Sequence, residues 1–152
     1  MKKRIKIVLV LCVVFALFLS VSISASAENA EIDPNLMRGD LYAMWGSTTV
    51  SVPGTNGSGF SNLYIYKATT GTTASFKCTA KSADRNFDAR IVNCYGQSRS
   101  SWARNLDIDD IIHVSESGAV MGYQYSCEIS SDLFTFGYVD VSLDFSPDYL
   151  NN

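Results

Sequence analysis

The stretch Thr73–Lys81, which reads TASFKCTAK, decides the fold class of this chain. In this stretch, polar residues alternate with small or apolar ones. The small or apolar residues are Ala74, Phe76, Cys78 and Ala80. Successive side chains of a β-strand point to opposite faces of the sheet, so a period of two predicts a strand with one buried and one solvated face. A helix would need a period near 3.6 instead.

Similar segments recur along the chain from Leu41 onward, where β-formers dominate and strong helix formers are sparse. Thr48–Val52 either continues the first predicted strand, Leu41–Trp45, or forms a strand of its own. The predicted number of strands is therefore seven or eight. Short strands separated by turns predict an all-β chain, a single antiparallel β-sandwich of jelly-roll type. The predicted strands are Leu41–Trp45, Thr48–Val52, Asn62–Ala68, Thr73–Lys81, Ala89–Tyr95, Asp110–Val114, Val120–Ile129 and Phe134–Phe145.

The N-terminus indicates the compartment. A basic start, MKKRIK, is followed by an apolar run from Ile7 to Ile23 and by the small-x-small pattern Ala25-Ser26-Ala27. This order is typical of a secretory signal peptide, which we expect to be helical, to occupy residues 1–27 and to be cleaved. An uncleaved membrane anchor is the alternative, although the apolar run is near the lower length limit for a membrane span. We therefore expect a secreted, extracellular protein, free or held at the cell surface.

The rest of the chain divides into two parts. Residues 28–39 are polar, contain Pro34 and show no periodicity, so we expect a loose N-terminal lead. Residues 40–152 form the predicted sandwich domain. Membrane contact is expected only through residues 1–27 before cleavage, and the oligomeric state is not determined by the sequence.

The charge of the chain is uneven. Cleavage after Ala27 would remove four of the 12 basic residues and none of the 15 acidic ones, which leaves a net charge of −7. Such a domain would repel a phosphate backbone, so nucleic acid is excluded as a partner. Every remaining basic residue lies between Arg38 and Arg104, and none follows. We expect cross-strand pairing to neutralise these charges; a basic patch for an acidic partner is the alternative.

Three cysteines remain after the signal peptide: Cys78, Cys94 and Cys127. Secreted proteins can form disulfides, and an odd number leaves at least one thiol unpaired within the chain. If Thr73–Lys81 and Ala89–Tyr95 form a hairpin, Cys78 faces Cys94, and this bridge is our first prediction. Cys78–Cys127 across the two sheets is the alternative, and three free buried thiols are a third possibility.

The polar connection from Gly96 to Asp107, together with Tyr95, is the best candidate for a binding site. An aromatic platform beside amide and guanidinium donors suits the recognition of sugars or peptides. The alternative role of Trp102 is to plug one end of the sandwich. The predicted ligand-binding residues are Tyr95, Gln97, Arg99, Trp102, Arg104 and Asn105.

Catalytic and metal sites are not indicated by the sequence. His113 is the only histidine, so a Cys/His hydrolase is the one enzymatic alternative, and no cysteine lies in a setting that would lower its pKa. The Asp84–Asp88 segment begins like an EF-hand loop but lacks the glycine and the glutamate that such a loop needs. We therefore predict no catalytic residues, no metal and no cofactor.

These observations together predict a small secreted, non-catalytic binding domain. Its ligand would be a carbohydrate, a cell-wall component or a protein, contacted by loops at the end of the sandwich. A secreted bacteriocin-like effector or an inhibitor that acts on a protein target is the alternative function.

Overall fold

The alternation in Thr73–Lys81 is realised as a strand with those same bounds, β4, in the computed structural model. The structure describes residues 42–131 and 137–151, so the predicted signal peptide and N-terminal lead lie outside the described residues. Strands, turns and loops make up this part of the chain, and it contains no helix long and apolar enough to cross a membrane. The described residues belong to one compact unit, Ile32–Asn152.

Nine strands are present in the described residues, one or two more than predicted. They are β1 (Gly46–Pro53), β2 (Ser58–Phe60), β3 (Ile65–Tyr66), β4 (Thr73–Lys81), β5 (Phe87–Val92), β6 (Ala103–Leu106), β7 (Ile111–Ser115), β8 (Gln124–Ser131) and β9 (Tyr138–Ser146).

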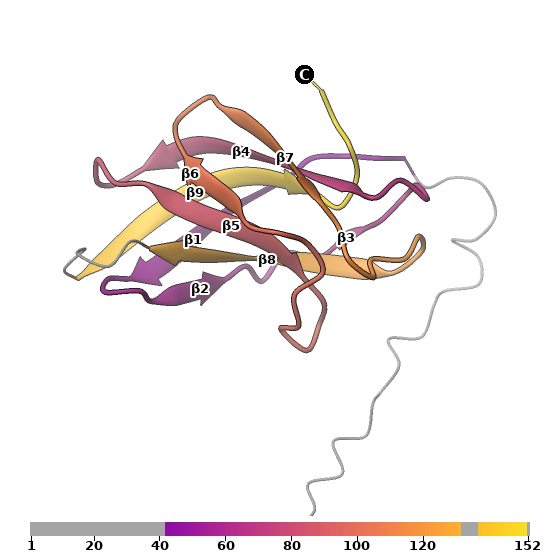
Figure 1. Cartoon of the computed structure of the whole chain (residues 1–152). Helices are drawn as coiled ribbons and strands as arrows, with labels where there is room; N and C mark the ends of the chain where they lie inside the picture. Colours follow the sequence, from indigo (N-terminus) through magenta and orange to yellow (C-terminus); the bar gives the residue numbers. More distant parts are fainter. Residues whose placement is uncertain (1–41, 132–136, 152) are drawn as a thin grey trace, which may run out of the picture. The chain divides into compact units, whose positions relative to one another are not determined.

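The strands form two antiparallel sheets that pack as two layers (Figure 1). The four-stranded sheet has the order β1-β9-β4-β7, and its β1–β9 register runs from Gly46 opposite Phe145 to Pro53 opposite Tyr138. The five-stranded sheet has the order β2-β8-β5-β6, and β3 also pairs with β8. The structure therefore confirms an all-β, sandwich-like fold.

A single hydrophobic core fills the space between the sheets, because each strand points every second side chain inward. Phe76 and Phe145 enter the core from the four-stranded sheet, and Phe87, Ile91 and Ile129 enter it from the five-stranded one, all with 0% exposure. In β9 the alternate apolar residues are the buried ones, and they are Val139, Val141, Leu143 and Phe145.

Both open sides of the sandwich are closed by close contacts between the sheets. On one side, a methyl group on Gly59 of β2 would lie 2.6 Å from Cγ1 of Val50 in β1, so only glycine allows this approach. On the other side, the segment before β6 bonds to the end of β7: Ser101 N–H donates to Ser115 O at 2.9 Å. Each contact joins consecutive strands of the chain that belong to different sheets.

The predicted hairpin between Thr73–Lys81 and Ala89–Tyr95 is wrong. β4 pairs with β7 and β9, and β5 pairs with β6 and β8, so the two segments lie in different sheets. The turn between them carries the chain from one sheet to the other instead of folding it back on itself. Local sequence does not reveal this, because either arrangement buries the same inward face.

Other predicted boundaries shift for local reasons. Residues 42–45 form no strand, and the segment from Gly96 to Asp107 contains β6 instead of being a loop throughout. Within β4, Ser75 is buried although it was predicted to face solvent, because Asp148 and Leu150 hydrogen-bond to it. Ala80 was predicted to face inward but is exposed, since a bulge between Cys78 and Ala80 shifts the alternation.

Candidate functional site

The predicted binding residues near Tyr95 form the tip of a hairpin. The side chain of Asn93 organises this turn: its Oδ1 accepts the Tyr95 N–H at 3.1 Å and the Gln97 N–H at 2.9 Å. Gly96 has φ +72°, which favours glycine. Arg99 N–H donates to Ile91 O at 2.7 Å, so the returning segment continues alongside β5. The side chains of Gln97 and Arg99 are hydrogen-bonded to each other, with Arg99 Nη2 donating to Gln97 Oε1 at 3.1 Å.

Trp102 and Arg104 lie on the outer face of the five-stranded sheet, apart from the turn tip. Ala103, between them, points inward with 0% exposure, so its two neighbours point outward. The Trp102 ring centroid lies 4.3 Å from Cζ of Arg90 in β5 and 5.7 Å from Cζ of Arg104. The predicted alternative, a tryptophan that plugs the sandwich, is not what the structure shows, because Trp102 is outside the hydrophobic core.

Two ion pairs hold the guanidinium groups around this ring. Arg90 Nε donates to Glu128 Oε2 at 2.6 Å, and Arg104 Nη1 pairs with Asp88 Oδ2. Glu128 is only 5% exposed, which makes the first pair partly buried. Each carboxylate accepts a hydrogen bond from one of the five N–H donors of its guanidinium group. Further donors of both arginines are therefore available to a ligand at the edge of Trp102.

An exposed phenylalanine extends this surface. Phe60 in β2 lies opposite Glu128 in β8 and is 52% exposed. A methyl group placed on Gly96 would lie 3.9 Å from the Phe60 ring, so the turn that carries Tyr95 borders the same surface. We call this surface the Trp102 face, and it consists of Phe60, Asp88, Arg90, Trp102, Arg104 and Glu128.

Asn105, the last predicted ligand residue, has a local structural role. Its φ is +55°, a left-handed conformation that asparagine tolerates better than most residues. Its N–H donates to Asp88 Oδ1 at 3.0 Å, so the residue bends the end of β6 around the Asp88 side chain.

Sequence reasoning missed four members of the Trp102 face: Phe60, Asp88, Arg90 and Glu128. They come from three strands that are separated by up to 68 residues in the sequence. Only the strand order and register place them on the same sheet face as Trp102. No role was predicted for any of these four residues from the sequence.

Pairing between basic and acidic residues occurs as expected from the uneven charge distribution, but, among the described residues, only Arg90–Glu128 is a cross-strand pair of directly opposite residues. Lys81 pairs with Asp107 at 2.8 Å, Arg90 with Glu128, and Lys67 with Glu116 at 2.7 Å. In each case a basic residue of the first part of the chain meets an acidic residue of the last part. The Trp102 face contains two arginines and two carboxylates and is neutral as a whole.

The three described cysteines are free, so neither predicted bridge is present in the structure. Cys78 in β4 and Cys94 in the turn after β5 do not face each other, because their strands lie in different sheets. Cys78 and Cys127 are buried, and desolvation raises the pKa of both thiols, that of Cys127 to about 12. Cys94 is exposed.

A serine and a histidine also lie within hydrogen-bond distance of each other. Ser75 Oγ is 3.0 Å from His113 Nδ1, but it also donates to Asp148 O and accepts the Leu150 N–H, both at 2.9 Å. The single hydroxyl proton of Ser75 is used in the hydrogen bond to Asp148 O. His113 must therefore be the donor in its hydrogen bond with Ser75 Oγ, through Nδ1. Ser75 is 0% exposed, and this geometry anchors the C-terminal segment instead of activating a nucleophile. His113 also contacts the Tyr149 ring, with centroids 4.4 Å apart.

No group of three or more histidine, cysteine, aspartate or glutamate side chains that could hold a metal ion occurs within residues 42–131 and 137–151. In comparisons with known proteins, no family model, no curated protein and no solved structure matches this chain.

Proposed function

We propose that this chain is a small secreted binding domain without catalytic activity, and that the Trp102 face is its ligand-binding surface. One observation carries the proposal: the Trp102 ring lies 4.3 Å and 5.7 Å from two guanidinium carbons on the outer face of a sheet, and the exposed Phe60 ring lies on the same face, with β8 and β5 between the two rings. Aromatic surface beside directed hydrogen-bond donors is typical of sites that recognise sugars and peptides. A site built on strands is also more rigid than a loop.

The ligand class follows from the chemistry of this surface. The face is neutral overall, and it offers guanidinium N–H groups and ring surface. A carbohydrate, a cell-wall component or a protein with exposed carbonyl, hydroxyl or carboxylate oxygens matches these donors. The Tyr95 turn, which borders Phe60, would contribute to the same contact, as the sequence-based prediction of an end-loop site requires.

We infer further that the sandwich is a jelly roll. β2 and β3 pair with the same strand, β8, and count as one broken strand, which leaves eight strand positions. The first and last strands, β1 and β9, are then neighbours in one sheet, and the second and second-last are neighbours in the other. This nested order is the order of a jelly roll, an architecture shared by many lectin domains, although the fold alone does not define a function.

Binding of the purified mature protein to a glycan array, to isolated cell walls and to immobilised cell-surface proteins tests the proposal. Trp102→Ala is expected to abolish binding to one of these ligand sets. Tyr138→Ala is the matched control, because Tyr138 is an exposed aromatic residue (76%) of β9 in the other sheet. Equal binding by the wild type and both variants would place the site elsewhere, and growth inhibition of neighbouring cells without such binding would favour an effector.

A further inference from the structure

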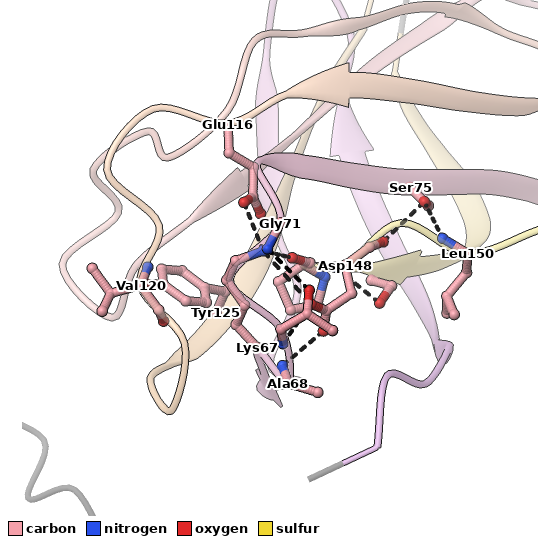
Figure 2. A network of polar contacts seen from close by, with 12 residues as sticks. Lys67, Ala68, Gly71, Ser75, Glu116, Val120, Tyr125, Asp148 and Leu150 are labelled. Atoms are coloured by element: carbon pink, nitrogen blue, oxygen red, sulfur yellow. Dashed lines mark hydrogen bonds and ion pairs between the residues drawn. The ribbon is translucent and has the colours of Figure 1, made fainter.

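Three charged side chains meet in the interior where the ends of β3, β7 and β9 come together. They belong to Lys67, Glu116 and Asp148, and their side chains are only 1%, 2% and 1% exposed (Figure 2). Lys67 Nζ lies 2.7 Å from Glu116 Oε2 and 3.6 Å from Asp148 Oδ1, and it also contacts the carbonyl oxygen of Pro147. Charged groups are almost never buried to this degree without a partner or a role.

Glu116 is the unusual member of this cluster. Neither of its carboxylate oxygens has a hydrogen bond of good geometry within the described residues, although Oε2 is in ion-pair contact with Lys67. Desolvation is the largest influence on this carboxyl group and raises its pKa, against the opposing effect of Lys67. A buried acceptor without a hydrogen bond costs stability, so its presence calls for an explanation. A proton-transfer role supplies one.

Asp148 is held in a very different way. Its Oδ2 accepts the Ala68 N–H at 2.8 Å, and its Oδ1 accepts the Thr69 N–H at 2.9 Å and the Thr69 hydroxyl at 2.6 Å. Three donors therefore fix this carboxyl group beside the lysine. Donors in such positions also stabilise the negative charge that develops on oxygen when a nucleophile adds to a carboxyl carbon.

We propose that Lys67 and Asp148 condense to an intramolecular amide bond, with Glu116 as the catalytic proton carrier. The inference is independent of the proposed binding function, because the cluster contains none of the residues of the Trp102 face. It assigns a covalent cross-link between the end of β3 in one sheet and the segment that follows β9 in the other.

The reaction balances without any further reagent. Glu116 takes a proton from the Lys67 ammonium, and the freed lone pair of Nζ forms a bond with Cγ of Asp148. The carbonyl electrons move onto Oδ1, where the N–H and the hydroxyl group of Thr69 stabilise the charge. The other carbon–oxygen bond then breaks, and that oxygen leaves as water. Lys67 supplies both protons of this water, Glu116 carries them one at a time, and Glu116 ends as the carboxylate that it was at the start.

Burial is what makes this step favourable. Desolvation raises the pKa of Glu116, which makes this carboxylate a better acceptor for a proton of the ammonium group that it contacts. Holding both groups in contact range also replaces a bimolecular encounter, an advantage equivalent to effective concentrations of roughly 10⁵ M or more. Exclusion of water then protects the amide from hydrolysis.

The ion pair between Lys81 and Asp107 is a natural comparison within the same chain. Its charged atoms are closer, 2.8 Å apart, but the Asp107 side chain is 62% exposed. The Lys81 side chain is itself only 5% exposed, but Asp107 is solvated and its hydrogen bond with Lys81 lowers its pKa, so this carboxylate does not take up the ammonium proton. We therefore expect no amide at Lys81, although its distance to the carboxylate is shorter.

Intact mass spectrometry of the mature, disulfide-reduced protein tests the proposal directly. The expected mass is that of the sequence less one water molecule. A tryptic digest should contain the uncleaved peptide Gly39–Lys77 joined to the C-terminal peptide that begins at Asn105, because a modified Lys67 is no longer a cleavage site. This readout needs no variant, so it stands even if variants fold poorly.

Variants then assign the roles. We expect the full sequence mass, without loss of water, for each of the variants Lys67→Arg, Glu116→Gln and Asp148→Ala. The control variant Lys81→Arg is expected to show the loss of one water molecule, as the wild type does. A wild-type protein that is folded, by circular dichroism, and has its full sequence mass would overturn the proposal. It would also be overturned if the water loss were present but the digest placed it within a single peptide, as in a cyclised aspartate.

Discussion

The guanidinium carbon of Arg90 lies 4.3 Å from the ring centroid of Trp102, while its Nε donates to the nearly buried carboxylate of Glu128 at 2.6 Å. One side chain of β5 thus links a residue of β8 with the segment that leads into β6. Trp102, Arg90 and Glu128 therefore form a row of contacting groups across the segment that leads into β6 and the neighbouring strands β5 and β8. Its strength decides how rigid the proposed binding surface is.

We expect Arg90→Ala to lower the free energy of unfolding by about 2 kcal/mol, because it removes a cation–π contact and leaves the Glu128 carboxylate buried without a partner. The double variant Arg90→Ala/Glu128→Ala should cost less than the sum of the two single changes. Urea unfolding of the four proteins measures this coupling. Arg104→Ala is the control, because its guanidinium side chain is 65% exposed and should contribute no more than about 1 kcal/mol. A coupling near zero would contradict the role given to Arg90.

Thiol labelling should separate the three cysteines by exposure. Cys94 is exposed and should react with a soluble thiol reagent in the native protein, whereas Cys78 and Cys127, both with 0% exposure, should react only after unfolding. The count in denaturant, without reductant, should be three. A count of one, with Cys94 as the labelled residue, would reveal a Cys78–Cys127 disulfide, and a fourth thiol, that of Cys12, would show that the N-terminal segment is retained.

Alkaline pH should destabilise the protein partly through Cys127. Desolvation raises its pKa from 9.0 to about 12 in the folded state. The folded protein therefore keeps the thiol proton that the unfolded chain gives up, and the stability that this contributes is fully present below pH 9.0 and is lost as the pH rises toward 12. The loss amounts to a few kcal/mol, at about 1.4 kcal/mol for each pH unit.

Unfolding experiments with reductant between pH 8 and pH 11 measure this loss. The Cys127→Ala variant should have a lower stability at every pH, because of the cavity, but a shallower decline than the wild type. Parallel curves for the two proteins would show that the Cys127 thiol titrates normally.

Closure of the sandwich at Gly59 can be tested with one methyl group. Gly59→Ala would place its Cβ 2.6 Å from Cγ1 of Val50 and 2.9 Å from the backbone oxygen of Ser51, so one sheet edge must move. We expect a loss of about 1–3 kcal/mol in the free energy of unfolding, typical of overpacking. Gly71→Ala is the control, since the nearest atom there is the Thr69 hydroxyl at 3.3 Å and the change should stay below about 1 kcal/mol. Equal thermal shifts for both variants would argue against a tight β1–β2 contact.

The strands with strong alternation were the predictable part of this fold. β4 has the predicted bounds, and β9 lies within a predicted strand up to Phe145 and buries its alternate apolar residues, because a period of two is a property of a few consecutive side chains. β2 and β6 were missed, since they are three and four residues long and lie in segments rich in glycine, serine and asparagine. Short edge strands depend on their neighbours more than on their own sequence.

The candidate site was predictable only in part. Trp102 and Arg104 were identified from composition, and the structure does bring them together. Tyr95 and Gln97 lie in a separate turn, and Asn105 has a local structural role. Arg90 could not be assigned to the site from the sequence, because its position relative to Trp102 depends on the register of two strands.

The sequence by itself determined the fold class, the inward face of the long strands and the need for charge pairing, because each of these follows from the nature and order of nearby residues. The tertiary structure decided which strands pair, and through them which side chains meet. Arg90 beside Trp102, and Lys67 between Glu116 and Asp148, are contacts of this second kind. The physical reason is that burial of the inward faces fixes each strand's orientation locally, whereas the choice of neighbour is made by packing the whole chain around one core.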